Sequence, residues 1–189
     1  MVYAWQAVNP YFGSLGLEYD NVGDHVDVCA IAPYFGSSLG DFDYPPGNPH
    51  SQQVKDGGLP FVFSYLEDNI NTVLRQAVSD WNDLATTHNT EIWCYEAGQH
   101  LVGTGPAVDD AELRNIFQAA NRDPRMGNMY KLFVNMWNEE TPEGSLIAWY
   151  HSMSSMGHAG AWGLMENEND YDNVKWTAIQ ETLDTSDPN

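Results

Sequence analysis

Four short apolar runs divide the chain, and each is followed by a loop and a segment of helical period. The runs cover residues 2–8, 26–36, 92–95 and 145–150. The second run, VDVCAIAPYFG, is almost continuously apolar until Pro33 and Gly36 end it, as expected for a strand that is covered on both faces. Short length and flanking Gly and Pro residues favour strands over buried helices for these runs.

Segments with helical periodicity lie between the runs. In residues 65–87, apolar side chains recur at spacings of three and four and form one broad face: Leu66, Ile70, Val73, Leu74, Ala77, Trp81 and Leu84. Another helix is predicted after Asp109 and Asp110, whose charges suit the positive end of a helix dipole. Pro124 is expected to end that helix before a further helical segment. A last helix is predicted over residues 174–183.

Strands that alternate with helices at this spacing indicate βαβ units and a parallel sheet. We therefore predict an α/β fold with a single domain over residues 1–189. Residues 36–60 contain Tyr44-Pro45-Pro46-Gly47 and Gly57-Gly58 and show little periodicity, which predicts a long surface loop after the second strand. A long loop at the C-terminal end of a strand favours a functional role.

The composition is that of a strongly acidic globular protein. The 27 Asp and Glu residues against 7 Lys and Arg residues give a net charge of -20. This charge repels phosphate backbones and anionic lipid surfaces, so neither nucleic acid nor a membrane is expected as a partner. The acids do not alternate as they do in a calcium-binding loop, which favours a solvated acidic surface over a cation site.

Cysteines and histidines do not indicate a metal site. Cys29 and Cys94 each lie inside an apolar run, which favours buried free thiols. His100, His151 and His158 lack metal-ligand spacing. No run of 18 apolar residues could span a membrane, and the start of the chain, MVYAWQAVNP, lacks the basic and long apolar regions of a signal peptide.

The sequence EIWCYEAGQH, residues 91–100, places a carboxylate where the third run turns into a loop. Ligands of parallel barrels and open α/β sheets bind at the C-terminal ends of strands, so Glu96 is a candidate site residue. Because Cys94 precedes it by two positions, we expect both side chains to point toward the inner face of the sheet. The alternative is a loop acid paired with a nearby amide or arginine.

Tyr34 supports a site at Glu96. It ends the second run at the matching height, and its hydroxyl could donate a hydrogen bond to Glu96. The alternative for Tyr34 is ordinary aromatic packing.

Three motifs in this order resemble the C-terminal half of a clan-A type (β/α)8-barrel retaining glycoside hydrolase. They are VDVCAIAPYFG, EIWCYEAGQHLVG, and SLIAWYHSM followed by GAWGLMEN. The resemblance implies a partial TIM barrel with parallel strands five to eight and intervening helices. It implies that Glu96 is the nucleophile at the end of strand seven and that Tyr34 touches it from strand six. Trp162, and less strongly Trp149, would form the sugar platform.

Further side chains are candidates for binding sugar. Phe35 is an aromatic residue beside Tyr34, and Gln6 and Asn9 at the end of the first run could hydrogen-bond hydroxyls, although Asn9-Pro10 equally suits a turn. Gln99 and His100 follow Glu96 directly. These two residues, the segment NRDPRMG and Ala32, which replaces a histidine common in the clan, depart from the general pattern. Gln99-His100 and NRDPRMG suggest a less studied branch among bacterial polysaccharide-binding or polysaccharide-degrading proteins, whereas Ala32 implies that substrate hydrogen bonding differs at this point.

The barrel implied by the resemblance is incomplete. Retaining hydrolysis needs two carboxyls about 5 to 5.5 Å apart, and the acid/base of the clan follows strand four, before residue 1. Asn138-Glu139 has the right letters but follows a helical segment. We therefore expect a half-barrel truncated at its N-terminus, with an apolar inner face that includes Ala30, Ala32 and Cys94. Its open edges should require the missing N-terminal half-barrel or a dimer partner.

Three interpretations remain open at this point. The first is a glycoside hydrolase that acts on a polysaccharide or oligosaccharide by the retaining mechanism, with this chain inactive by itself and with no cofactor. The second is a non-catalytic carbohydrate-binding barrel. The third is an acidic scaffold without a sugar site. The resemblance also implies an extracellular or periplasmic location.

Overall fold

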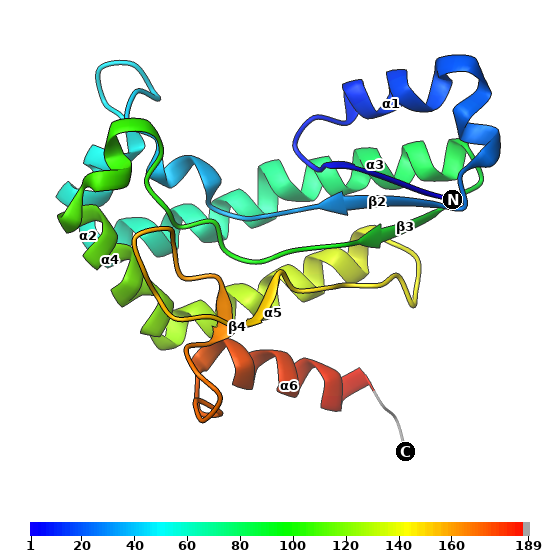
Figure 1. The fold of residues 1–189 in the computed structure, drawn as a ribbon. Coiled ribbons are helices and arrows are strands. Elements are labelled where there is room, and N and C mark those ends of the chain that lie inside the picture. Colours follow the sequence, from blue (N-terminus) through cyan, green and yellow to red (C-terminus); the bar gives the residue numbers. More distant parts are fainter. Residues whose placement is uncertain (187–189) are drawn as a thin grey trace.

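A computed structural model describes residues 1–186 and has a mixed α/β fold (Figure 1). Strands β1 (Val2–Gln6), β2 (Val28–Ala32) and β3 (Glu91–Cys94) form a parallel sheet in chain order. A parallel bridge between Cys94 and Ile147 adds the fourth apolar run beside β3. The predicted α/β class and the parallel order of the four runs are therefore confirmed.

Helices connect successive strands. They are α1 (Pro10–Glu18), η1 (Tyr19–His25), η2 (Ser37–Gly40), α2 (His50–Asn69), the π-helical turn η3 (Ile70–Leu74), α3 (Arg75–Thr87), η4 (Gly105–Asp109), α4 (Ala111–Arg122), α5 (Pro124–Glu140) and α6 (Val174–Ser186). Asp110 caps α4 by accepting a hydrogen bond from the Leu113 amide at 3.0 Å. Asp123 caps α5, which begins at Pro124 as predicted.

The prediction of a loop over residues 36–60 is wrong in its second half, because α2 begins at His50. The glycines and the proline that indicated a loop form a kink instead. Gly58 has φ 57° and ψ -151°, a conformation open to glycine. Pro60 follows this kink at the start of the next helical stretch, where its missing N–H costs no hydrogen bond.

A second, two-stranded parallel sheet lies after the main sheet. Its strands are β4 (His151–Met153) and β5 (Gly163–Met165), and residues 154–162 connect them. Strand β4 thus begins directly after the predicted run 145–150. The run itself pairs with β3 through a single bridge. The connection 154–162 carries Trp162.

One face of the main sheet packs against the helices. Helices α1, α3 and α5 run alongside the strands in Figure 1, and α3 contacts both β2 and β3. Cys29, Ile31, Ile92 and Cys94 belong to the core on this side. The prediction that Cys94 points to the inner face is therefore wrong: it pairs in register with Ile31, and register partners share a face. Cys94 thus gives no ground for the predicted inward direction of Glu96, which lies in a bend after the strand.

The opposite face, called the open face below, carries the alternate residues of each strand. On it, Val2, Tyr95, Leu146 and Tyr150 are exposed by 56, 43, 48 and 42 %. Ala32 is partly exposed, but Ala30 is buried, with its bulkier register partner Trp93 beside it. The prediction of an exposed apolar face that contains Ala30, Ala32 and Cys94 is therefore wrong for Ala30 and Cys94, and the exposed members of the open face are larger side chains.

Candidate functional site

The backbone holds Glu96 and Tyr34 at the same end of the sheet. Each residue lies two positions beyond its strand, β3 or β2. The Tyr95 amide donates to the Ile31 carbonyl at 3.1 Å, and the Phe35 amide donates to the Gly98 carbonyl at 3.1 Å. These bonds continue the parallel pairing past the strand ends and keep the two side chains in neighbouring positions.

Tyr34 responds electrostatically to Glu96. Burial raises the pKa of the Tyr34 hydroxyl well above its usual value, and the charge of Glu96 raises it further. Within residues 1–186, no hydrogen bond joins the two side chains. A protonated phenol beside a carboxylate remains able to donate a hydrogen bond to it or to a bound ligand.

Four rings from four segments pack together around Tyr34. Tyr34 meets His100, Tyr150 and Trp162 at centroid distances of 5.7, 6.1 and 6.0 Å, with interplanar angles of 78, 74 and 76°. Trp162 also meets His100 at 5.0 Å and Tyr150 at 5.7 Å. We call Tyr34, His100, Tyr150 and Trp162 the aromatic cluster. Edge-to-face packing of this kind fixes the orientation of each ring.

His100 adds a polar edge to the aromatic cluster. Burial lowers the pKa of its imidazole, although the nearby charge of Asp41 opposes that effect, so the ring is neutral at pH 7. Its Nδ1 atom is buried and has no hydrogen-bond partner among the described residues. Leaving a buried nitrogen without a partner costs free energy.

The loop that carries Trp162 is anchored from behind. The carbonyl of Ala161 accepts hydrogen bonds from Gln99 Nε2 at 2.7 Å and from Lys175 Nζ at 3.3 Å. Lys175 is 1 % exposed and also donates to Asn121 Oδ1 at 3.0 Å. Two donors on the carbonyl that precedes Trp162 restrict the position of its indole. The sequence analysis did not identify Lys175 and Asn121. A lysine and an amide on otherwise apolar helix faces could have indicated them.

Several predicted sugar contacts lie elsewhere. Phe35 is fully buried and packs on Tyr130 and Phe133 at 5.4 and 6.1 Å, so its prediction as a sugar contact is wrong. Trp149 packs on the same two rings at 5.1 and 5.5 Å and thus faces α5. Strand alternation turns both residues toward the helices. Gln99 is 1 % exposed and serves the loop anchor described above, not the surface.

Gln6 and Asn9 lie at the end of β1. Gln6 is exposed and pairs in register with Ala32, which places it on the open face. Asn9 precedes α1, and its side chain makes no capping hydrogen bond. A role for either residue in sugar binding stays a prediction.

Among residues 1–186, no group of three or more His, Cys, Asp or Glu side chains is placed to hold a metal ion. The helices described in that range include none with the length and apolar character to cross a membrane. Cys29 and Cys94 are buried free thiols, as predicted. No family model, curated protein or solved structure matches the chain.

Proposed function

We propose that the open face and its strand ends form a carbohydrate site, and that the chain supplies four βα units of a retaining glycoside hydrolase-like (β/α)8 barrel. Glu96 is the nucleophile of this site. The observation that supports the proposal best is the convergence of Glu96 and the aromatic cluster at the C-terminal ends of parallel strands.

The aromatic cluster suits a sugar ring. Aromatic rings stack on the apolar faces of sugars, and a few convergent polar groups fix the orientation of the ligand. Trp162 and Tyr34 are partly exposed, and Tyr150 is 42 % exposed, so a ligand can reach the three rings. The Tyr34 hydroxyl and the His100 imidazole supply hydrogen-bonding groups among them.

The open face supports the barrel. Its exposed Tyr95, Leu146 and Tyr150 are apolar or amphipathic side chains that four further strands would cover. Those strands would come from residues outside 1–189 or from a second copy of the chain. They would pair with the edge of β1 and with the segment around Ile147, and they would also contribute the general acid/base.

In this mechanism the Glu96 carboxylate attacks the anomeric carbon and forms a covalent glycosyl intermediate. The acid/base of the complementary half protonates the departing glycosidic oxygen. It then takes a proton from water, which attacks the same carbon and releases Glu96. In this proposal Tyr34 donates a hydrogen bond to the carboxylate in the complex while Trp162 stacks on the sugar ring.

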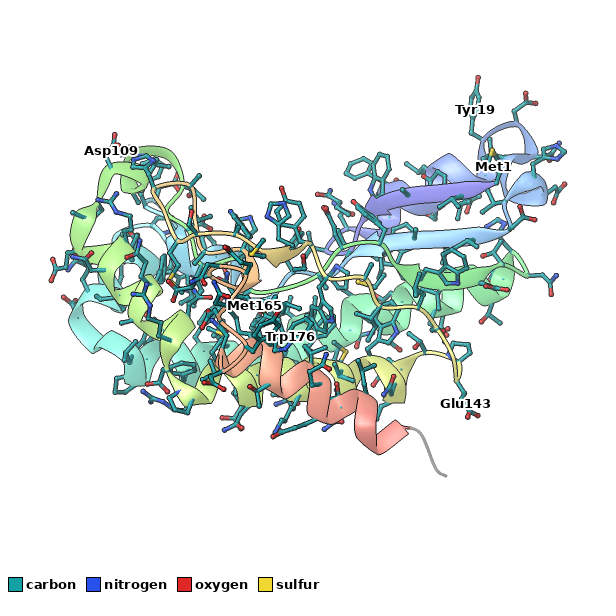
Figure 2. All side chains as sticks on the ribbon, turned by 60° about the horizontal axis from the view of Figure 1, so that its bottom comes forward. Met1, Tyr19, Asp109, Glu143, Met165 and Trp176 are labelled. Carbon is teal, nitrogen blue, oxygen red and sulfur yellow. The ribbon has the colours of Figure 1, made fainter. Side chains whose placement is uncertain are left out.

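Replacing Trp162 by Ala is expected to weaken glycan binding by about 10-fold, equivalent to about 1.4 kcal/mol, because the largest ring of the aromatic cluster is lost. A glycan array identifies the ligand, and calorimetry then compares the variant with the wild type. Tyr19→Ala is the matched control, since Tyr19 is 75 % exposed and lies near Met1 in Figure 2, at the N-terminal end of β1. Equal affinity of Trp162→Ala and wild type, or an array without any bound glycan, would contradict the proposal.

A further inference from the structure

Arg114 differs from the other Lys and Arg side chains of the chain, because it has no polar partner within residues 1–186. Five of the seven cations form salt bridges with carboxylates: Lys55, Arg75, Arg122, Arg125 and Lys131. Lys175 forms no salt bridge but donates hydrogen bonds to Asn121 and to the carbonyl of Ala161. The Nη1 atom of Arg114 is buried and has no hydrogen-bond partner among the described residues.

Arg114 lines a small cavity between α4, the loop after β3 and residues 157–161, which precede Trp162. The volume of the cavity is about 10 Å³, which is close to the space that a single water-sized occupant needs. Most of its side chains are apolar: Leu101, Val102, Ala107, Val108 and Phe117. The cavity is therefore too small for a sugar and suits one small occupant.

The carbonyl groups of the loop wall are already used as acceptors. The carbonyl of Ala161 accepts hydrogen bonds from Gln99 and Lys175. Gly157 and Gly160 exchange backbone hydrogen bonds with each other, at 2.9 and 3.3 Å. The amides of His158 and Ala161, in contrast, make no backbone hydrogen bond within residues 1–186. The lining thus offers donors, and its occupant has to be an acceptor.

The acids near Arg114 in the sequence have other partners. Asp109 accepts a hydrogen bond from His158 at 2.9 Å, and Asp110 pairs with Lys55 at 2.8 Å. Glu112 is exposed and lies two positions from Arg114, so the two side chains point to different sides of α4. The guanidinium is therefore not neutralised by a carboxylate of the described chain.

We propose that this cavity binds a small monovalent anion, such as chloride, that accepts a hydrogen bond from Arg114 Nη1. A buried cationic group without a partner costs free energy, and an anion offsets both its charge and its free donor, whereas water offsets the donor alone. The bound ion joins α4 to the loop that carries Trp162. This site is separate from the aromatic cluster and does not depend on the proposed carbohydrate function.

Thermal unfolding of the 189-residue chain at constant ionic strength tests the proposal. The Tm is measured in sodium chloride and in sodium gluconate, whose anion is too large for the cavity. We expect about 200 mM chloride, relative to gluconate, to raise the Tm of wild type by about 2 to 4 °C more than that of Arg114→Gln. Arg125→Gln is the matched control: Arg125 pairs with Asp123 at the surface, so this variant should respond to chloride as wild type does. An equal response of wild type and Arg114→Gln would overturn the proposal.

Crystals of wild type grown in sodium bromide locate the ion without any variant. Bromide replaces chloride in such a site and scatters anomalously, so we expect an anomalous peak within hydrogen-bond distance of Arg114 Nη1. Density without an anomalous signal at this position would mean that only water fills the cavity, and that result would also overturn the proposal. Because this measurement uses wild type, it decides the question even if Arg114→Gln does not fold.

Discussion

Replacement of Glu96 by Gln is expected to lower the rate of glycoside hydrolysis by at least about 10³-fold, because an amide cannot form the covalent intermediate. Gln keeps the size and most hydrogen bonds of Glu, so glycan affinity should change little. The assay measures release of reducing ends by the complete barrel, in which the chain is combined with its complementary half. Affinity is measured in parallel on the same preparation.

Glu91→Gln is the matched control for Glu96→Gln. Glu91 begins β3, at the other end of the same strand, and its carboxylate accepts a hydrogen bond from Trp93 Nε1 at 2.9 Å. Glu91→Gln should hydrolyse glycans at the wild-type rate. A Glu96→Gln variant as active as wild type would remove Glu96 from the mechanism. A wild-type barrel that binds glycans without hydrolysing them would instead support the non-catalytic carbohydrate-binding barrel.

Local patterns in the sequence predict most of the secondary structure correctly. The helix over residues 65–87 follows from apolar spacing alone, and Asp123 followed by Pro124 marks both the end of α4 and the start of α5. The positions of the four apolar runs follow from their own composition and from the Gly and Pro residues that flank them. The helical segments between the runs then imply a parallel sheet. The kink at Gly58 was missed because glycine and proline permit a loop and a helix start equally well.

The direction of individual side chains is harder to predict from the sequence. Whether Cys94 faces the helices depends on the register that pairs it with Ile31, and no local pattern fixes that register. For the same reason Phe35 and Trp149 were predicted at the sugar site, although both side chains pack on α5. Tyr34 and Glu96 lie at the same end of the sheet because both follow strand ends, where topology decides the position of a residue, and a shared role for them stays a prediction.

The anchor of the Trp162 loop could not be foreseen, since its members are distant in the sequence. Gln99, Asn121 and Lys175 meet only through the packing of α4 and α6 against the loop. An isolated lysine in a helix is normally a surface residue. Its burial here is a tertiary property, and it leads to a measurable dependence of stability on pH.

Lys175 is expected to make the folded protein more stable as pH rises from 8 toward the unfolded pKa of lysine. Burial lowers the pKa of its ammonium to about 8, while Glu166 and Asp170 favour the charge and Arg122 opposes it. Above pH 8 the unfolded chain binds more protons at this residue than the folded protein, so the free energy of unfolding increases with pH. Over the full interval the gain is about 3 kcal/mol.

Urea unfolding of wild type and Lys175→Met at pH 7 and about pH 9.5 measures this effect. The comparison isolates Lys175 because other titrating groups, such as the buried Tyr130, contribute equally to both proteins. The stability of wild type relative to the variant should rise by about 2 kcal/mol between these pH values. Lys131→Met makes the same change in a lysine of α5 that pairs with Glu181 at the surface, and its difference from wild type should stay constant. Equal pH dependence of wild type and Lys175→Met would mean that Lys175 is not held in the apolar interior, and the carbonyl of Ala161 would then depend on Gln99 alone.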